Sequence, residues 1–184
     1  ESEVTIGADA IEALQINDVI FDVAVNPDRG YALSIRGIAR EVAGSLDLKF
    51  TDPVDALRTL KFQDTGEGVI AKIADKTTAS VFYLRTLSNF DPKATTPIWM
   101  RRRIEKMGMR SISLVVDVTN YVMLELGQPM HAFDLASLRG NINVRLAADG
   151  EQLELLDGST VTLDAESLVI ADDEGAIALA GVMG

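Results

Sequence analysis

The sequence contains no cysteine and only one histidine, His131. Disulfides, zinc–thiolate sites, iron–sulfur clusters and a cysteine nucleophile are therefore excluded, as is a site with several histidine ligands, and we expect no bound metal. No apolar run approaches the roughly 20 residues that a membrane helix needs, and no signal peptide opens the chain. With an ordinary apolar fraction of 47%, these absences predict a globular cytoplasmic protein that makes no membrane contact.

Positive charge is also scarce. The sequence has 17 lysine and arginine residues against 28 aspartate and glutamate residues, which gives a net charge of −11. This balance argues against a protein that binds nucleic acid mainly by releasing counterions. Contact with RNA would require the few basic residues to cluster, and the densest cluster is WMRRRIEK at residues 99–106.

The spacing of apolar residues predicts both helices and strands. We expect one helix from a Ser34 cap to about residue 43, a second from Pro97 behind a Thr96 cap, and a third from an Asp117 cap to Leu126. Strands are predicted at residues 18–25, 69–73, 80–87, 112–116, 168–171 and 177–180, and turns at 26–30, 149–150 and 157–158. Residues 45–66 follow no clear pattern. Helices in the middle and strands at both ends indicate an α+β fold.

A glycine-rich segment, GEGVIA at residues 66–71, formally matches the fingerprint of dinucleotide-binding proteins. That fingerprint requires a strand before it and a helix after it. Here the preceding residues are polar and the following ones alternate like a strand, so a hairpin turn is favoured over a nucleotide site. A nucleotide-dependent oxidoreductase is therefore a distant hypothesis. The sequence has no P-loop lysine motif, and no ATP site is visible.

The basic cluster has two interpretations. It is either a solvated helix face or a contact for RNA phosphates, and Arg102 is our candidate within it. Arg110 is a better candidate, because it follows the glycine that ends the predicted helix and lies between two ordered elements.

The predicted start of the third helix places Thr119 and Asn120 in its first turn. Backbone N–H groups are free there, and the positive end of the helix dipole can hold a carbonyl oxygen or a developing anion. The alternative is that these residues and Asp117 only cap the helix. His131 follows Pro129 beyond the helix, and no serine–histidine–acid pattern surrounds it, so only an orienting role is open to it.

Small residues are frequent in the last segment of the sequence, ALAGVMG, which contains Ala180, Gly181 and Gly184. Small side chains allow backbone to approach a ligand closely, although they also pack in cores.

Together these segments resemble the beta chain of bacterial phenylalanyl-tRNA synthetases. The densest match is residues 113–134, SLVVDVTNYVMLELGQPMHAFD. WMRRR and GMR lie upstream of it as they do in the family, and IAREV and LAGVMG match near the two ends. The turn at residues 27–31, PDRGY, departs from the Pro-Asn-Arg of the family.

The resemblance implies that residues 1–184 form a tRNA-editing domain, a β-sandwich of unusual topology flanked by helices in three layers. It implies that Thr119 and Asn120 lie beside the scissile ester and that His131, the third catalytic candidate, lines the amino-acid pocket together with Pro129. Substrate-binding residues would be Pro129, Ala180, Gly181 and Gly184, and Arg110 would face the acceptor end of the tRNA. The pocket of the family continues beyond Gly184, so we expect the domain to be truncated at its C-terminal end.

The resemblance further implies an activity and its partners. The domain would hydrolyse tyrosyl-tRNA(Phe) by attack of water, without a covalent intermediate, a metal or any cofactor of its own. ATP and Mg²⁺ would belong to the whole synthetase, an α2β2 tetramer with an alpha subunit. A non-catalytic module that braces the synthetase or binds tRNA, inactive as an isolated fragment, is the alternative.

Overall fold

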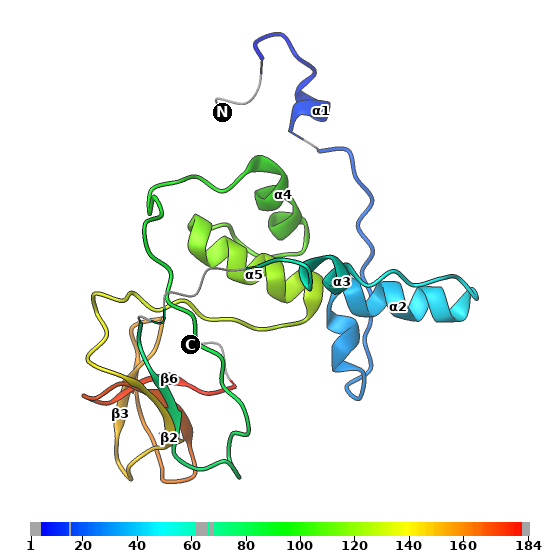
Figure 1. The fold of residues 1–184 in the computed structure, drawn as a ribbon. Coiled ribbons are helices and arrows are strands. Elements are labelled where there is room, and N and C mark those ends of the chain that lie inside the picture. The colour runs from blue at the N-terminus through cyan, green and yellow to red at the C-terminus, as the bar shows by residue number, and fades with distance from the viewer. Residues whose placement is uncertain (1–4, 15, 62–65, 67, 182–184) are drawn as a thin grey trace. The chain divides into compact units, whose positions relative to one another are not determined.

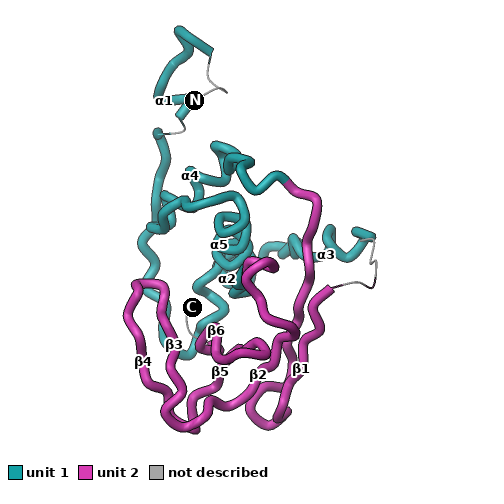
Figure 2. Tube along the Cα trace, turned by 90° about the vertical axis from the view of Figure 1, so that its left-hand side faces the viewer, with its two compact units in different colours: residues 1–62, 91–132 teal, residues 63–90, 133–184 magenta. Residues whose placement is uncertain are grey.

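The computed structural model describes residues 5–14, 16–61, 66 and 68–181 of the chain. The chain folds as two compact units, which Figure 2 distinguishes by colour. One unit comprises residues 1–62 and 91–132 and is here called the helical unit. The other comprises residues 63–90 and 133–184 and is here called the β unit. The polypeptide therefore passes between the units more than once.

The helical unit contains all of the helices that Figure 1 labels. Several predicted end signals are confirmed: Ser34 caps a helix through its side chain, and Gly127 ends another at a φ of 79°. The helices are α1 (Ala10–Ala13), the 3-10 helix η1 (Gly30–Leu33), α2 (Ile35–Ser45), α3 (Pro53–Leu57), α4 (Ile98–Lys106) and α5 (Leu114–Leu126).

Helix α2 packs through its small residues. Gly37 and Ala43 are buried, whereas Ile35 and Val42, whose spacing of seven residues puts them on one face of the helix, are about half exposed. A Cβ atom on Gly37 would lie 1.9 Å from the carbonyl oxygen of Tyr31. The glycine therefore permits the close approach of α2 to η1.

A buried carboxylate links α4 and α5. Asp117 is 0% exposed. It accepts hydrogen bonds from the hydroxyl groups of Thr96 and Ser111 and from the backbone N–H of Ile112. Because these donors precede α4 and α5, the carboxylate fixes how the two helices begin. The predicted caps at Thr96 and Asp117 are thus wrong, since the two side chains bond each other.

The β unit holds two sheets. Strands β1 (Ala71–Ile73), β2 (Ile142–Leu146), β5 (Leu168–Ala171) and β6 (Ala176–Leu179) form one in the order β1-β2-β5-β6, with β1 parallel to β2 and the other pairs antiparallel. A hairpin of β3 (Gln152–Glu154) and β4 (Thr160–Thr162) forms the second. The buried core contains Ala147, Leu153, Leu163, Val169 and Ala171.

The outcome confirms a mixed α+β fold, whereas the three-layer sandwich stays a prediction. The turn at 26–30 is confirmed by a bond from the Arg29 N–H to the Asn26 oxygen, and the strand at 168–171 is confirmed in full. Predicted strands at 18–25 and 80–87 are wrong, because both segments run without strand pairing. The predicted strand at 112–116 is wrong because Ser113 caps α5 there.

Candidate functional site

Thr119 and Asn120 lie within helix α5, one turn later than the sequence predicted. Because α5 begins at Leu114, they are beyond the first turn with its free N–H groups, and that part of the prediction is wrong. The Thr119 hydroxyl donates a hydrogen bond of 2.7 Å to the Val116 carbonyl, so its oxygen retains the capacity to accept. Both side chains are half-buried.

The segment after α5 leaves the helix as the sequence predicted. Gly127 adopts the left-handed conformation, and residues 128–132, including Pro129 and His131, are exposed. The side-chain amide of Gln128 donates to the Pro129 carbonyl at 3.2 Å. The exit loop thus presents polar and ring groups at the surface of the same unit that holds Thr119 and Asn120.

Three of the basic residues of α4 form specific contacts. Arg102 pairs with Glu105 at 2.8 Å, and Lys106 pairs with Asp18 at 2.6 Å. The Arg103 guanidinium donates to the Tyr121 hydroxyl at 2.8 Å. Arg110 is exposed beyond α4, after Gly108 turns the chain at a φ of 84°.

Two aromatic rings join this basic face. Trp99 and Tyr121 meet edge to face with ring centroids 5.4 Å apart, and Arg103 lies 5.4 Å from the centroid of the indole. Burial and Glu125 raise the pKa of the Tyr121 hydroxyl, and the charge of Arg103 acts in the opposite direction. Sequence reasoning gave Trp99 and Tyr121 no role, because they meet only through the packing of α4 against α5.

Ala180 and Gly181 belong to the β unit. Ala180 follows β6 and donates its N–H to the Leu168 carbonyl at 2.9 Å. Gly181 is exposed at a φ of 78°, and a Cβ atom there would have no neighbour within 4 Å among the described residues. Gly184 lies outside the described residues. The single cavity predicted to join these residues to Thr119 and His131 therefore remains a prediction.

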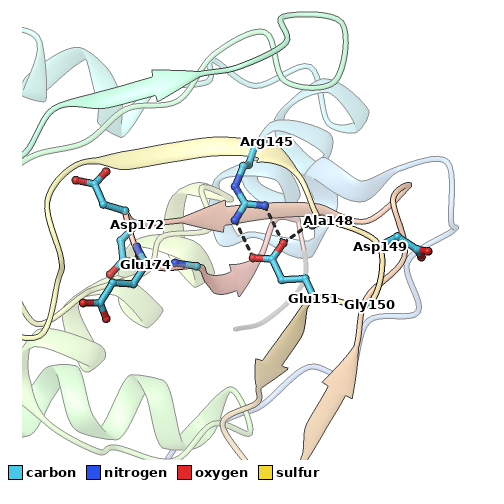
Figure 3. Close-up of a pocket in the computed structure, with 9 residues that line it drawn as sticks. Arg145, Ala148, Asp149, Gly150, Glu151, Asp172 and Glu174 are labelled. Atoms are coloured by element: carbon cyan, nitrogen blue, oxygen red, sulfur yellow. Dashed lines mark hydrogen bonds and ion pairs between the residues drawn. The ribbon is translucent and has the colours of Figure 1, made fainter.

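The β unit also carries an acidic surface hollow of about 500 Å³, drawn in Figure 3. Glu151 pairs with Arg145 through both carboxylate oxygens, at 2.7 and 2.8 Å, and accepts from the N–H groups of Ala148 and Ala176. Arg145 is the main cause that lowers the pKa of Glu151 to about 2. Because these partners occupy the Glu151 carboxylate, Glu151 stabilises the loops around the hollow.

The polar groups of the hollow do not form a recognisable metal site. Asp172 accepts from the backbone N–H groups of Arg139, Glu174 and Gly175. No three His, Asp or Glu side chains in the described parts of the chain are arranged to hold a metal ion. The excess of carboxylates would repel a phosphate, so we do not place an RNA contact there.

No helix within the described residues is both long and apolar enough to cross a membrane.

Comparison with known proteins defines the class. The B3/4 domain family matches residues 78–184, more than half of the sequence, and the chain belongs to that family. It is also 53% identical over 182 residues to the phenylalanine–tRNA ligase beta subunit of Streptomyces avermitilis and 53% identical over 178 residues to that of Thermobifida fusca. The beta subunit of Neisseria meningitidis is 42% identical over 179 residues.

These alignments cover 97–99% of the chain but only 21–22% of each relative. The chain thus spans about a fifth of the length of the beta subunits that it matches. The resemblance to the beta chain of bacterial phenylalanyl-tRNA synthetases is confirmed across nearly all of the sequence.

Proposed function

We propose that the chain is the tRNA-editing part of a phenylalanyl-tRNA synthetase beta subunit and that it hydrolyses tyrosyl-tRNA(Phe). The observation that carries the proposal is 53% identity to a phenylalanine–tRNA ligase beta subunit over 99% of the chain. Within the whole cytoplasmic enzyme, an α2β2 tetramer, the alpha subunit supplies the ATP- and Mg²⁺-dependent synthesis. This chain acts afterwards on the esterified tRNA.

In the proposed reaction, water attacks the carbonyl carbon of the ester. The tetrahedral intermediate then releases the terminal ribose hydroxyl of the tRNA and free tyrosine. Because the proton of the Thr119 hydroxyl is engaged by the Val116 carbonyl, its oxygen acts as an acceptor that orients the attacking water. Asn120 supplies amide N–H donors, which Thr119 does not, and is therefore assigned to the developing oxyanion. His131, on the exposed exit loop, orients the water or the ribose.

The value of a second site follows from the chemistry of the two amino acids. A hydrophobic pocket rejects an isostere carrying an extra hydroxyl by only about a hundredfold. A pocket that hydrogen-bonds the hydroxyl rejects the analogue lacking it by about ten-thousandfold or more, because its polar groups would lose their partners. A polar editing pocket shaped by Pro129, Ala180, Gly181 and Gly184 would thus destroy the tyrosyl product and spare the phenylalanyl one. Arg110 and Arg102 contact the tRNA.

Gly181 provides the direct test. We expect Gly181→Trp in the complete synthetase to abolish deacylation of tyrosyl-tRNA(Phe), because the indole would fill the pocket. The open space around the Gly181 Cβ position indicates that the main local cost is the left-handed backbone, about 1–2 kcal/mol. Gly158→Trp is the matched control, because Gly158 has a φ of 81° and equally open surroundings in the β3–β4 hairpin. Equal rates of deacylation by the two variants would show that Gly181 does not line the pocket.

A non-catalytic role is the second candidate. It is favoured by the net charge of −11, which argues against binding RNA mainly by counterion release. Incubating the 184-residue chain alone with tyrosyl-tRNA(Phe) tests it. Turnover by the chain would exclude the inert module, whereas tRNA binding without turnover would support it.

A further inference from the structure

The basic face of α4 adjoins a second hollow within the helical unit. This hollow measures about 510 Å³, and it lies between α4 and residues 11, 12, 17 and 18. Its lining holds three basic residues, two acidic ones and two others: Arg102, Arg103, Lys106, Glu12, Asp18, Ile11 and Asn17. The Nε atom of Arg102 is shielded from solvent and has no hydrogen-bond partner among the described residues. The hollow therefore gathers three cations against two carboxylates, together with an unused donor, in a chain whose net charge is −11.

Arg103 connects the hollow to the aromatic pair. Arg103 lines the hollow, and its guanidinium lies over the face of Trp99 and donates to the Tyr121 hydroxyl. These contacts fix the orientation of the guanidinium. Trp99 is 42% exposed. An exposed indole beside a fixed guanidinium combines the two features by which proteins hold unpaired nucleotides, a stacking surface and a contact for the backbone phosphate.

We propose that this surface, formed by Trp99, Arg103, Tyr121 and the adjoining hollow, binds single-stranded RNA. One base lies against the Trp99–Tyr121 pair, and the neighbouring phosphate enters the hollow beside Arg102, Arg103 and Lys106. The inference rests on the proposed function, because it takes the RNA to be the single-stranded acceptor end of tRNA. Neither Trp99 nor Tyr121 is needed for ester hydrolysis, so the surface is a positioning site for the substrate.

Two features favour this ligand over others. A base in a duplex is stacked and paired, so an exposed indole can reach only an unpaired one. An acidic peptide would satisfy the cations but would leave the aromatic pair without a partner. Asp18 currently pairs with Lys106, and its side chain is 50% exposed. Exposed ion pairs of this kind contribute little to stability. A phosphate that accepts hydrogen bonds from two basic side chains can therefore displace the Asp18 carboxylate.

The sequence offers a direct probe, because Trp99 is its single tryptophan. We would titrate the 184-residue chain with a short single-stranded oligoribonucleotide ending in CCA and follow the emission of Trp99. The expected result is saturable quenching. Binding should weaken with salt, and Arg103→Gln should reduce the slope of log affinity against log salt by about 0.7, the loss of one phosphate contact to a single strand.

Variants separate stacking from charge. Trp99→Ala, measured by the anisotropy of labelled RNA, should weaken binding by about tenfold or more, the effect of losing one base–aromatic stack. Tyr121→Phe keeps the ring and removes the hydroxyl that accepts from Arg103, so a smaller loss is expected. Arg40→Gln is the matched control, because Arg40 lies 4.9 Å over the ring of Tyr31 in the same unit but does not line the hollow. It should change binding only slightly.

Each result decides the inference. Quenching that Arg103→Gln weakens and Arg40→Gln does not would support it. Absence of quenching, equal loss in both arginine variants, or stronger binding of a duplex of the same length would overturn it. Editing assays keep the two proposals distinct. Hydrolysis of tyrosyl-tRNA(Phe) that Trp99→Ala leaves unchanged would refute this surface alone, whereas RNA quenching without any hydrolysis would refute only the proposed editing.

Discussion

The buried carboxylate of Asp117 gives the sharpest prediction about stability. Asp117→Ala would leave the hydroxyl groups of Thr96 and Ser111 and the N–H of Ile112 without their acceptor. A hydrogen bond to a charged group contributes about 1.5–3 kcal/mol. Since Ser111 and Ile112 are only part-buried and recover some bonding to water, we expect a loss of about 3–5 kcal/mol in the free energy of unfolding. Against a total of about 5–15 kcal/mol for a domain, that loss is large.

Asp117→Asn separates charge from shape. The asparagine oxygen still accepts from Ile112, but the amide nitrogen replaces the oxygen that both hydroxyls bond and must donate to them instead, so the expected loss is smaller, about 1–2 kcal/mol. The three hydrogen bonds and the charge of Arg101 outweigh burial and lower the pKa of Asp117. The stabilisation from this carboxylate is therefore complete above the ordinary aspartate pKa of about 3.9 and falls as the pH drops through the lowered value.

Urea unfolding followed by Trp99 fluorescence measures these losses, because Trp99 lies in α4 just after Thr96. Asp91→Ala is the control, since Asp91 is exposed and accepts from the Lys93 N–H at 2.9 Å. It should cost about 0.5 kcal/mol. If Asp117→Ala were no less stable than Asp91→Ala, the carboxylate would not organise the start of the two helices.

Two further predictions concern the rest of the fold. Glu151→Gln should destabilise the β unit at neutral pH. Because Arg145 lowers the pKa of Glu151 to about 2 from 4.5, the stabilisation is complete above 4.5 and is lost as the pH falls toward 2. Unfolding by circular dichroism at pH 7 and at acid pH should thus show a difference from wild type that shrinks in acid, and a constant difference would contradict the assignment. Gly37→Ala should cost about 2–3 kcal/mol, because its Cβ meets the Tyr31 carbonyl at 1.9 Å. Gly44→Ala, on the same helix with nothing within 4 Å, should be neutral or stabilising, and equal melting temperatures would refute the close packing.

Local signals predicted those parts of the fold that local chemistry decides. Ser34 and Gly127 mark helix ends through bonds and dihedral angles within a few residues of themselves. The strand at 168–171 was predictable because its apolar run is short and buried, with Val169 and Ala171 both at 0% exposure. Each of these signals needs little knowledge of the distant chain.

The parts of the fold that local signals did not predict depend on contacts between distant segments of the chain. The segment at 18–25 alternates like a strand, yet it runs unpaired, with Val19 at 73% and Phe21 at 81% exposure. Ser113 and Asp117 are both good caps by residue type, and only the buried donors around Asp117 decide between them. That choice moved Thr119 and Asn120 beyond the first turn of α5.

The candidate site was partly predictable for the same reason. The arginines of α4 stood out as a run, because positive charge is scarce in this sequence. The contact between Trp99 and Tyr121 crosses two helices and has no signature in residue spacing. The resemblance to synthetase beta chains supplied the roles of Thr119 and His131, which residue chemistry alone left open against simple capping and hydrogen bonding.

Selective destruction of the tyrosyl ester depends on recognition of one phenolic hydroxyl. We would therefore compare the rates at which the complete synthetase deacylates tyrosyl-tRNA(Phe) and phenylalanyl-tRNA(Phe) under the same conditions. A hydrogen-bonding pocket predicts that the tyrosyl ester is cleaved about ten-thousandfold faster. Equal rates, or cleavage of neither ester, would contradict the assignment of this chain to editing.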